Sequence, residues 1–219
     1  MNQLDFRSKN LNPDLAKEIL DRASEYFYCA SNQLTTKRLV LRSICWEKPR
    51  EGWLTLNVDG SAAGVSGMAG GGGLIRDENG EWVIGFARKI GTTTSFMAEL
   101  WALRDGLLLC LQIQAQVVCV ELDAKAVVDA FNMQSYSNTV ISSIMDDCRH
   151  LATQISHLRV RHIYSEANRC ADFLAKLGLS IVSDYVELPS PPVDLLHILE
   201  EDACGMAVNR LCPVSLFSV

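Results

Sequence analysis

The chain has 219 residues, and its 48% apolar and 21% charged residues are the proportions of an ordinary globular protein. That length accommodates one domain with a sizeable core plus terminal extensions. The eight cysteines are scattered without a C-x-x-C pair, which disfavours a zinc site or a disulfide framework, and the net charge of −6 argues against a strongly basic nucleic-acid-binding module.

No run of 18 apolar residues occurs along the chain, and no apolar signal core follows Met1. We therefore expect an intracellular, soluble protein without a membrane partner, located in the nucleus or the cytoplasm. The first 45 residues predict one helix, over about 13–30, in which apolar residues recur near helical spacing and Pro13 suits the first turn. A linker containing Pro and Gly follows at residues 48–52.

Three strands are expected next, over about 54–59, 70–77 and 81–90. Asn79 and Gly80 lie between the second and the third strand, and they indicate a hairpin turn because both residue types tolerate positive φ. Helical and extended segments then alternate. The remaining expected elements are a helix over 95–112, a strand over 116–122, one or two helices over 124–153, a strand over 157–163 and a final helix over 167–179.

The change from consecutive strands to alternating helix and strand predicts an α/β fold. Its sheet would be mixed and five-stranded, with three antiparallel strands followed by two parallel ones and with helices on both faces. We assign residues 46–180 to this domain, 1–45 to an N-terminal helical extension and 181–219 to a C-terminal tail. A short amphipathic helix, over 193–204, is expected in the tail and should dock on the domain through its apolar side.

Four acidic residues occur in settings that one sheet could bring together. Asp59 and Asp123 each end an apolar strand, and Glu99 and Asp172 lie in helical segments. Carboxylates that converge without basic partners repel one another unless a cation lies among them. Oxygen ligands of this kind suit Mg²⁺ or Mn²⁺. Each acid also has an ordinary explanation, as a turn residue, a helix cap or a solvated surface acid.

Five sequence blocks surround these acids in a fixed order. They are Asn57–Ser61, Gly70–Asp77, Ala98–Leu107, Glu121–Ala124 and Ala167–Ala175. Together the blocks resemble type 1 ribonuclease H, in the form found in plant non-LTR retroelements and in proteins derived from them. No single block is specific, but five blocks in order with plausible gaps are a strong signal. The resemblance covers about residues 46–179.

The resemblance implies a ribonuclease H-like fold and a catalytic site with two bound Mg²⁺ ions, for which Mn²⁺ is an alternative. It also implies that Asp59, Glu99, Asp123 and Asp172 are both the metal ligands and catalytic residues. His162, ten residues before Asp172, would be a further catalytic residue that assists proton transfer. A strand-end histidine without a role fits the same pattern equally well.

Substrate contacts are expected from Gly60, from Ser61 and the loop that runs on to Gly73, and from Asn168. Glycine lets main-chain N–H groups approach a phosphate or a 2′-OH closely. The chain departs from the family pattern at two positions. Phe96 and Ala124 stand where active members usually carry Asn and Ser, so two polar substrate contacts are missing while the metal ligands are intact.

The resemblance therefore implies a metal-dependent endonuclease that cuts the RNA strand of RNA–DNA hybrids, acts as a monomer and has nucleic acid as its partner. A second hypothesis belongs to another class of protein. It describes a domesticated, retroelement-derived nucleic-acid-binding module with little or no turnover. Intact ligands without the usual substrate contacts would give metal binding without efficient cutting.

Overall fold

The computed structural model describes residues 39–62, 67–133 and 139–213, which belong to one compact unit. The helix expected over residues 13–30 lies outside the described residues. The strands are β1 (Leu39–Ile44), β2 (Leu54–Ala62), β3 (Met68–Arg76), β4 (Trp82–Thr92), β5 (Val117–Leu122), β6 (His157–His162), β7 (Tyr185–Leu188) and β8 (Val208–Pro213). The helices are α2 (Ser95–Gln112), α3 (Lys125–Asn132), α4 (Thr139–Ala152), η1 (Ser165–Ala167), α5 (Arg169–Ser180), η2 (Val193–Leu195) and α6 (Leu196–Ala203). Within the described ranges, no helix is both long and apolar enough to cross a bilayer.

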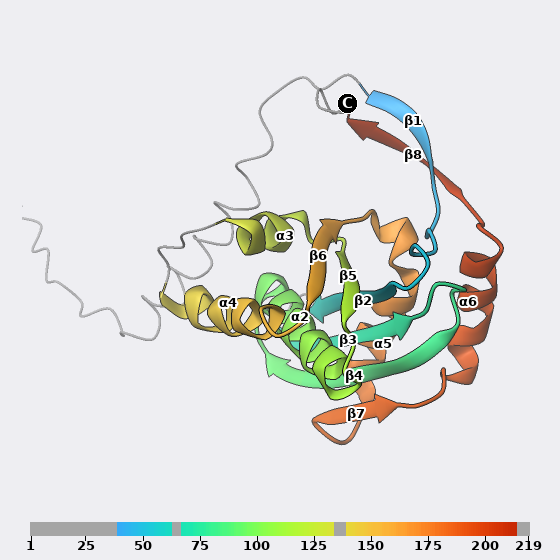
Figure 1. The fold of residues 1–219 in the computed structure, drawn as a ribbon. Helices are drawn as coiled ribbons and strands as arrows, with labels where there is room; N and C mark the ends of the chain where they lie inside the picture. The colour runs from blue at the N-terminus through green and yellow to red at the C-terminus, as the bar shows by residue number, and fades with distance from the viewer. Residues whose placement is uncertain (1–38, 63–66, 134–138, 214–219) are drawn as a thin grey trace, which may run out of the picture. The chain divides into compact units, whose positions relative to one another are not determined.

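A six-stranded mixed sheet forms the centre of the unit, in the order β6-β5-β2-β3-β4-β7 (Figure 1). Strands β2, β3 and β4 are antiparallel neighbours, whereas β5 runs parallel to β2 and β6 parallel to β5. The predicted α/β class and the predicted succession of three antiparallel and two parallel strands are thus confirmed. The sheet has one strand more than the five expected, because β7, from the C-terminal tail, pairs antiparallel with the outer edge of β4.

Helices cover both faces of this sheet, as predicted. Helices α2 and α4, with α3 beside them, lie on one face, and α5 lies on the other (Figure 1). Side chains alternate along β2 accordingly. Leu56 and Val58 are fully buried and face Gly106 of α2, while Asn57 faces Asn168 at the start of α5. The polar residues of β2 therefore share the α5 face of the sheet.

The glycine run Gly70–Gly73 lies inside β3, in agreement with the strand predicted over about 70–77, so the expected substrate loop does not extend to Gly73. Its glycines allow helices to approach both faces of the strand. A Cβ on Gly72 would lie 2.3 Å from the main-chain carbonyl carbon of Leu174 in α5, and a Cβ on Gly71 would meet Ala102 of α2 at 3.4 Å. The run is a packing surface, and it fixes how deeply α5 sits on the sheet.

The turn between β3 and β4 forms as predicted from Asn79 and Gly80. Gly80 adopts a φ of 87°, a value that suits glycine, and its N–H donates to the Asp77 carbonyl at 3.0 Å. The Asp77 carboxylate accepts the main-chain N–H groups of Asn79 and Glu81 at 2.9 and 2.8 Å. This hairpin determines the register of β4.

Segments from both flanks of the central domain also form structure. Strand β1 pairs antiparallel with β8 in a separate two-stranded ribbon. Helix α6 falls inside the region predicted to be helical, and its residues Ile198 and Leu199 pack with the fully buried Leu174 and Leu195. The apolar side of the tail helix therefore docks on the domain, as expected. The domain boundaries at residues 46 and 180 stay predictions.

Candidate active site

Two of the four expected acids come from neighbouring parallel strands. Strands β2 and β5 are paired so that Asn57 lies beside Glu121. Two residues further along the chain, Asp59 of β2 lies close to Asp123, which directly follows β5. The sequence predicted that this strand ends at Asp59, but β2 is longer. It continues to Ala62 because the residues that follow Asp59 pair with β3.

Helix α2 brings Glu99 to these aspartates. Thr94 caps the helix, and its side chain accepts the N–H of Met97 at 3.3 Å. Gly60 allows the helix to approach β2 closely, since a Cβ on Gly60 would lie 2.2 Å from the main-chain nitrogen of Glu99. The main-chain N–H of Gly60 hydrogen-bonds to the Glu99 carboxylate. A single glycine thus positions the third acid.

The three carboxylates form one cluster, in which Asp59 and Glu99 are buried and Asp123 is partly exposed. Oxygen atoms of Asp59, Glu99 and Asp123 lie within 4.8 Å of one another, and Asp59 and Glu99 are only 7% and 8% exposed. Burial, with the charges of Asp123 and Asp172, raises the pKa of Asp59 to about 8. Burial and the charge of Asp59 raise the pKa of Glu99 well above its usual value, and burial also raises the pKa of Asp123. All three ionised forms are therefore disfavoured without a cation.

The residues of this cluster fit a divalent cation. Oxygen Oε2 of Glu99 is buried and has no hydrogen-bond partner among the described residues, so it is an acceptor that a cation would satisfy. The donor atoms are hard carboxylate oxygens, which Mg²⁺ and Mn²⁺ prefer. A cation would also offset the repulsion that raises the pKa values. Asp59, Glu99 and Asp123 are the residues that would hold it.

Asp172 lies beside this cluster rather than within it. Its side chain, in the first turn of α5, is 44% exposed and accepts a hydrogen bond from Lys176 Nζ at 2.7 Å. After burial and the charge of Asp123, the charge of Asp172 is the next cause of the raised pKa of Asp59. Asp172 is therefore close enough to act electrostatically on the site, and its role as a fourth metal ligand stays a prediction.

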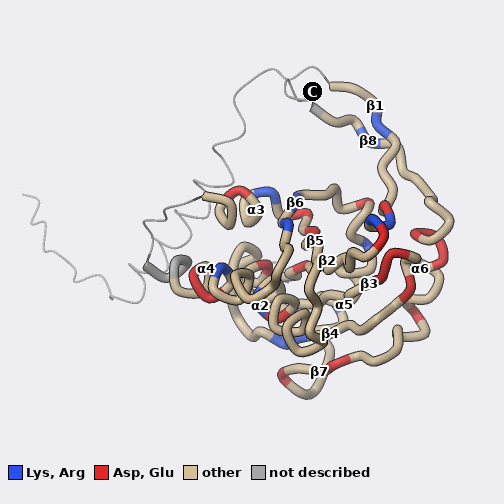
Figure 2. Tube along the Cα trace, viewed as in Figure 1, with Lys and Arg blue, Asp and Glu red and all other residues tan. Residues whose placement is uncertain are grey.

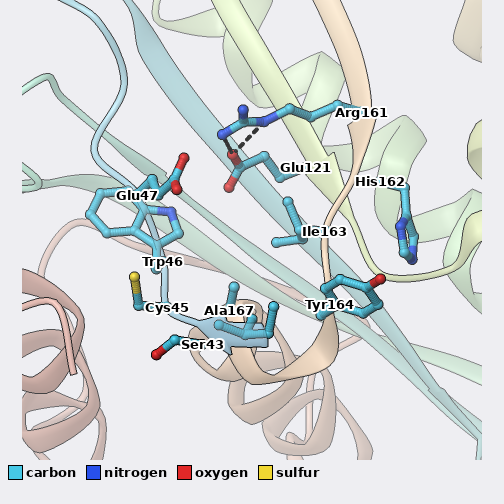
Figure 3. Close-up of a pocket in the computed structure, with 11 residues that line it drawn as sticks. Ser43, Cys45, Trp46, Glu47, Glu121, Arg161, His162, Ile163, Tyr164 and Ala167 are labelled. Carbon is cyan, nitrogen blue, oxygen red and sulfur yellow. Dashed lines mark hydrogen bonds and ion pairs between the residues drawn. The ribbon is translucent and has the colours of Figure 1, made fainter. Parts of the chain in front are cut away.

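His162 is the last residue of β6 and is half-buried. Its ring packs edge-on against Tyr164, with the ring centroids 5.5 Å apart. Burial lowers the pKa of its imidazole, and a hydrogen bond to the main chain of Asp123 opposes that change. His162 also lines a pocket together with Trp46 and Glu121 (Figure 3). An imidazole that is neutral near pH 7 suits proton transfer, but this role stays a prediction.

The three expected substrate-binding residues lie in two different environments. Gly60 and Ser61 continue β2 and are partly exposed. Asn168 is 1% exposed, its side-chain nitrogen donates to the Val58 carbonyl at 3.0 Å, and its side-chain oxygen lies 3.4 Å from Asn57 Nδ2. The side chain of Asn168 thus contacts the protein interior. Substrate contact by these three residues stays a prediction.

Sequence reasoning missed a group of buried polar residues behind the carboxylates. Asn57, Arg76, Glu121 and Asp202 are each 3% exposed or less, and hydrogen bonds connect them. For Asn57, Arg76 and Glu121 the signal in the sequence is a polar residue in an apolar strand, and Asp202 is an acid of a short tail helix. That pattern does not reveal which partners satisfy the polar groups.

Phe96 is a core residue and not a substrate-facing one. It is 6% exposed and belongs to the main apolar cluster with Leu100.

The family pattern suggests Phe96→Asn as a way to restore a substrate contact. We expect this substitution to lower the free energy of unfolding by about 2–4 kcal/mol, because it removes a buried ring and buries an amide. Urea denaturation measures the effect. Leu108→Asn, at an exposed position of the same helix, should cost less than about 1 kcal/mol. Equal effects of the two substitutions would contradict the packing of Phe96.

The raised pKa values predict how the stability of the metal-free protein depends on pH. In an unfolded chain these carboxyls ionise near pH 4, whereas folded Asp59 keeps its proton up to about pH 8. A carboxyl with a raised pKa stabilises the fold below its unfolded pKa, and this contribution is lost as the pH rises through the folded pKa. The Tm in EDTA should therefore fall between about pH 5 and about pH 8, and the fall should be smaller in Asp59→Asn. Identical profiles for the two proteins would contradict this expectation.

Comparison with known proteins places the chain in a family. Residues 57–178, over half of the chain, match the family model described as reverse transcriptase-like. A protein of Arabidopsis thaliana, provisionally named a ribonuclease H protein, is 30% identical over 200 residues. That alignment covers 90% of this chain, and the chain spans only 32% of the Arabidopsis protein.

Solved structures agree with this placement. RNase H1 from Halobacterium salinarum gives a TM-score of 0.55 at 23% identity, over 58% of this chain and 97% of that chain, which shows the fold. LC11-RNase H1, solved in complex with an RNA/DNA hybrid and isolated from compost by a metagenomic approach, gives a TM-score of 0.52 at 27% identity. It covers 57% of this chain and 96% of that one. The chain therefore belongs to the reverse transcriptase-like family, and its central domain is of the ribonuclease H type.

Proposed function

We propose that this chain is a metal-dependent endonuclease that hydrolyses the RNA strand of RNA–DNA hybrids. The observation that carries the proposal is the convergence of Asp59, Glu99 and Asp123, whose oxygens lie within 4.8 Å of one another. Asp59 lies inside β2, Asp123 directly follows β5, and Glu99 lies in α2, and these rigid elements are suited to hold ligands. Relatives named as ribonuclease H, one of them solved with an RNA/DNA hybrid, support the substrate class.

The proposed cofactor is a pair of Mg²⁺ ions, for which Mn²⁺ would substitute, with Asp172 as the fourth ligand beside Asp59, Glu99 and Asp123. When bound, the metal would supply an activated water and neutralise the charge that develops on the phosphate. The protein holds the ligands in place, and the N–H of Gly60 retains the Glu99 carboxylate in the cluster.

The other site residues would bind substrate and move protons. Gly60 and Ser61 lie next to Asp59 and are partly exposed, so the scissile strand would pass against them. His162 would accept or deliver a proton at its imidazole, because its lowered pKa keeps the ring neutral near pH 7.

Basic residues are spread over the fold, so binding of the phosphate backbone should be modest. Figure 2 shows Lys and Arg on several elements, including α3, β6 and β8, and not in one dense stretch. Some of them are already paired, as Lys125 is with Asp129 and Arg210 with Glu166. Because log affinity scales with the number of phosphates that are neutralised, we expect hybrid binding to be weak and to depend on the metal.

Cleavage of a labelled RNA–DNA hybrid tests the proposal directly. With Mg²⁺, the wild-type chain should cut the RNA strand of the hybrid and leave an RNA duplex and a DNA duplex of the same sequence intact. EDTA should abolish the cutting. Cutting that persists in EDTA, or equal cutting of all three substrates, would overturn the assignment.

The departures at Phe96 and Ala124 favour the second candidate, a nucleic-acid-binding module with little turnover. Phe96 is buried in the core, and Ala124 forms the N-cap of α3 without any side-chain hydrogen bond, so neither residue presents a polar group to a substrate. A hybrid-binding measurement with Ca²⁺ in place of Mg²⁺ separates the two candidates. Tight binding in Ca²⁺ without cutting in Mg²⁺ would favour the module, and cutting in Mg²⁺ would favour the enzyme.

A further inference from the structure

A fully buried arginine lies at the centre of the polar group behind the carboxylates. Arg76, at the end of β3, is 1% exposed, and its guanidinium carbon lies 3.4 Å from the centre of the Trp46 ring. Nη1 donates to Asp202 Oδ2 at 2.8 Å, and Nη2 donates to Asn57 Oδ1 at 2.8 Å. Arg76 therefore connects helix α6, which carries Asp202, with the interior of β2.

The contact with Arg76 fixes which way the Asn57 amide points. A guanidinium has only donors, so it must face the amide oxygen, and the amide nitrogen must point the other way. That nitrogen donates to Glu121 Oε2 at 2.8 Å and lies 3.4 Å from Asn168 Oδ1. The Glu121 carboxylate can only accept, so it must face the amide nitrogen of Asn57. Arg76 and Glu121 together therefore select one of the two possible orientations of the Asn57 amide.

Asn57 in turn fixes the amide of Asn168. With the Asn168 oxygen directed at the Asn57 nitrogen, its own nitrogen donates to the Val58 carbonyl at 3.0 Å. The Asn168 amide also lies close enough to Asp123 to oppose the rise in pKa that burial causes in this carboxyl. A reversed Asn168 amide would present its oxygen to Asp123, and two acceptors would then repel each other.

Asp202 is the outer end of this chain of contacts. It is 3% exposed in α6, and its second oxygen accepts from Arg169 Nη2 at 3.0 Å. Helix α6 lies outside residues 57–178, the part that matches the family model. Its neighbour Glu201 also pairs with Arg169 but does not touch Arg76. The two adjacent acids of α6 thus differ in whether they reach the buried arginine.

We propose that helix α6 positions the candidate active site through Asp202, Arg76, Asn57 and Asn168, and that Asp202 and Arg76 are positioning residues for the ligand Asp123. The last step, from Asn168 to a metal held by Asp123, rests on the proposed nuclease function. Among the described residues, removal of Asp202 leaves Asn57 as the remaining side-chain hydrogen-bond partner of the buried Arg76 guanidinium. The guanidinium then shifts or becomes hydrated, and the two amides lose their fixed orientation.

Asp202→Ala tests the proposal, and Glu201→Ala is its matched control in the full chain. Each substitution removes one carboxylate from α6, but only the first one affects Arg76. In the metal-free protein, the side-chain NH₂ signals of Asn57 and Asn168 in ¹⁵N NMR spectra should shift or broaden in Asp202→Ala and stay at their wild-type positions in Glu201→Ala. Unchanged Asn168 signals in a folded Asp202→Ala protein would overturn the proposal.

A Mn²⁺ titration of the same proteins reports the effect on the site. The Kd for Mn²⁺ should rise about tenfold in Asp202→Ala, the lower end of the range for outer-shell partners of metal ligands, and by less than about twofold in Glu201→Ala. In cleavage, kcat at saturating Mg²⁺ should fall more than KM rises, because Asp202 lies behind the site and not against the substrate. Equal Mn²⁺ affinity in the two variants would overturn the coupling.

A second variant covers the case in which Asp202→Ala does not fold. Arg76→Met combined with Asp202→Leu removes both buried charges, a replacement that is often neutral for stability, yet it also removes the contact that orients Asn57. Shifted Asn168 signals in this variant support the proposal, and wild-type signals overturn it. If wild-type protein binds no Mn²⁺, the proposed function fails, and the NMR signals of the metal-free protein still decide whether α6 orients Asn168.

Discussion

Asp59→Asn is expected to lower the rate of Mg²⁺-dependent hybrid cleavage by at least about a thousandfold, which corresponds to about 4 kcal/mol of transition-state stabilisation. The substitution keeps the shape of the side chain and removes its charge at the centre of the carboxylate cluster. Burial and the charge of Asp123 raise the pKa of Asp59 to about 8, so the metal-free fold must keep this carboxyl protonated at neutral pH, and a neutral amide removes that cost. The metal-free variant should therefore be at least as stable as wild type at neutral pH.

Two measurements separate this effect from a general loss of structure. The Tm in EDTA should be equal to or above the wild-type value, and a Mn²⁺ titration should show weaker binding. Asp194→Asn is the matched control, because Asp194 is an exposed acid in η2, and its activity should be unchanged. Cleavage by Asp59→Asn at the wild-type rate would show that the site lies elsewhere.

Gly60→Ala is expected to damage both the fold and the site. A Cβ at this position would lie 2.2 Å from the main-chain nitrogen of Glu99 and 2.3 Å from the main-chain carbon of Ala98, so α2 would have to move away from β2. Backbone atoms cannot yield as a flexible side chain can, so the free energy of unfolding should fall by about 3 kcal/mol or more. In the protein that still folds, Glu99 would leave the cluster and Mn²⁺ affinity would fall.

Gly71→Ala is the appropriate control for this loss. The nearest atom to a Cβ on Gly71 is the flexible Cδ1 of Ile90, at 3.3 Å, so a small movement relieves the contact. Denaturation curves and Mn²⁺ titrations of the two variants should therefore differ clearly. A stability of Gly60→Ala close to that of Gly71→Ala would mean that α2 does not lie against Gly60.

Local sequence patterns predicted most of the central sheet and its helices, because each element can be recognised from its own residues. The Asn79–Gly80 turn, the apolar strand before Asp59 and the long helix around Glu99 could each be identified within a short window. Placing Asp59 beside Asp123 needed only the rule that parallel neighbours align their carboxyl ends. Three of the four expected ligands therefore come together in one cluster. Asp172 was expected in that cluster from the family pattern alone, and its pairing with Lys176 was not expected.

Pairings between distant segments could not be predicted in this way. Strands β1 and β8 pair although nearly all of the described sequence lies between them. Strand β7 pairs with β4 although a helix-rich stretch of sequence separates them. Short strands in a flanking segment have little alternation of apolar and polar residues. They become strands because another strand pairs with them. The burial of Arg76 also depends on distant segments and could not be predicted. A charged residue at a strand end is ordinarily solvated, and Arg76 is buried because Asp202 and Trp46 lie over it.

The ribbon of β1 and β8 has a consequence for how this unit can be joined to other polypeptides. Leu39 and Pro213, the first and last residues that the structure describes, are register partners in the ribbon, so their Cα atoms are about 5 Å apart. A segment cut at these two adjacent positions could be inserted into a surface loop of another protein without stretching its host, and the two positions could be joined by a short linker while new termini are opened elsewhere. The hairpin tip at Asn79–Gly80 is a suitable place for such new termini, because it is an exposed turn at the surface.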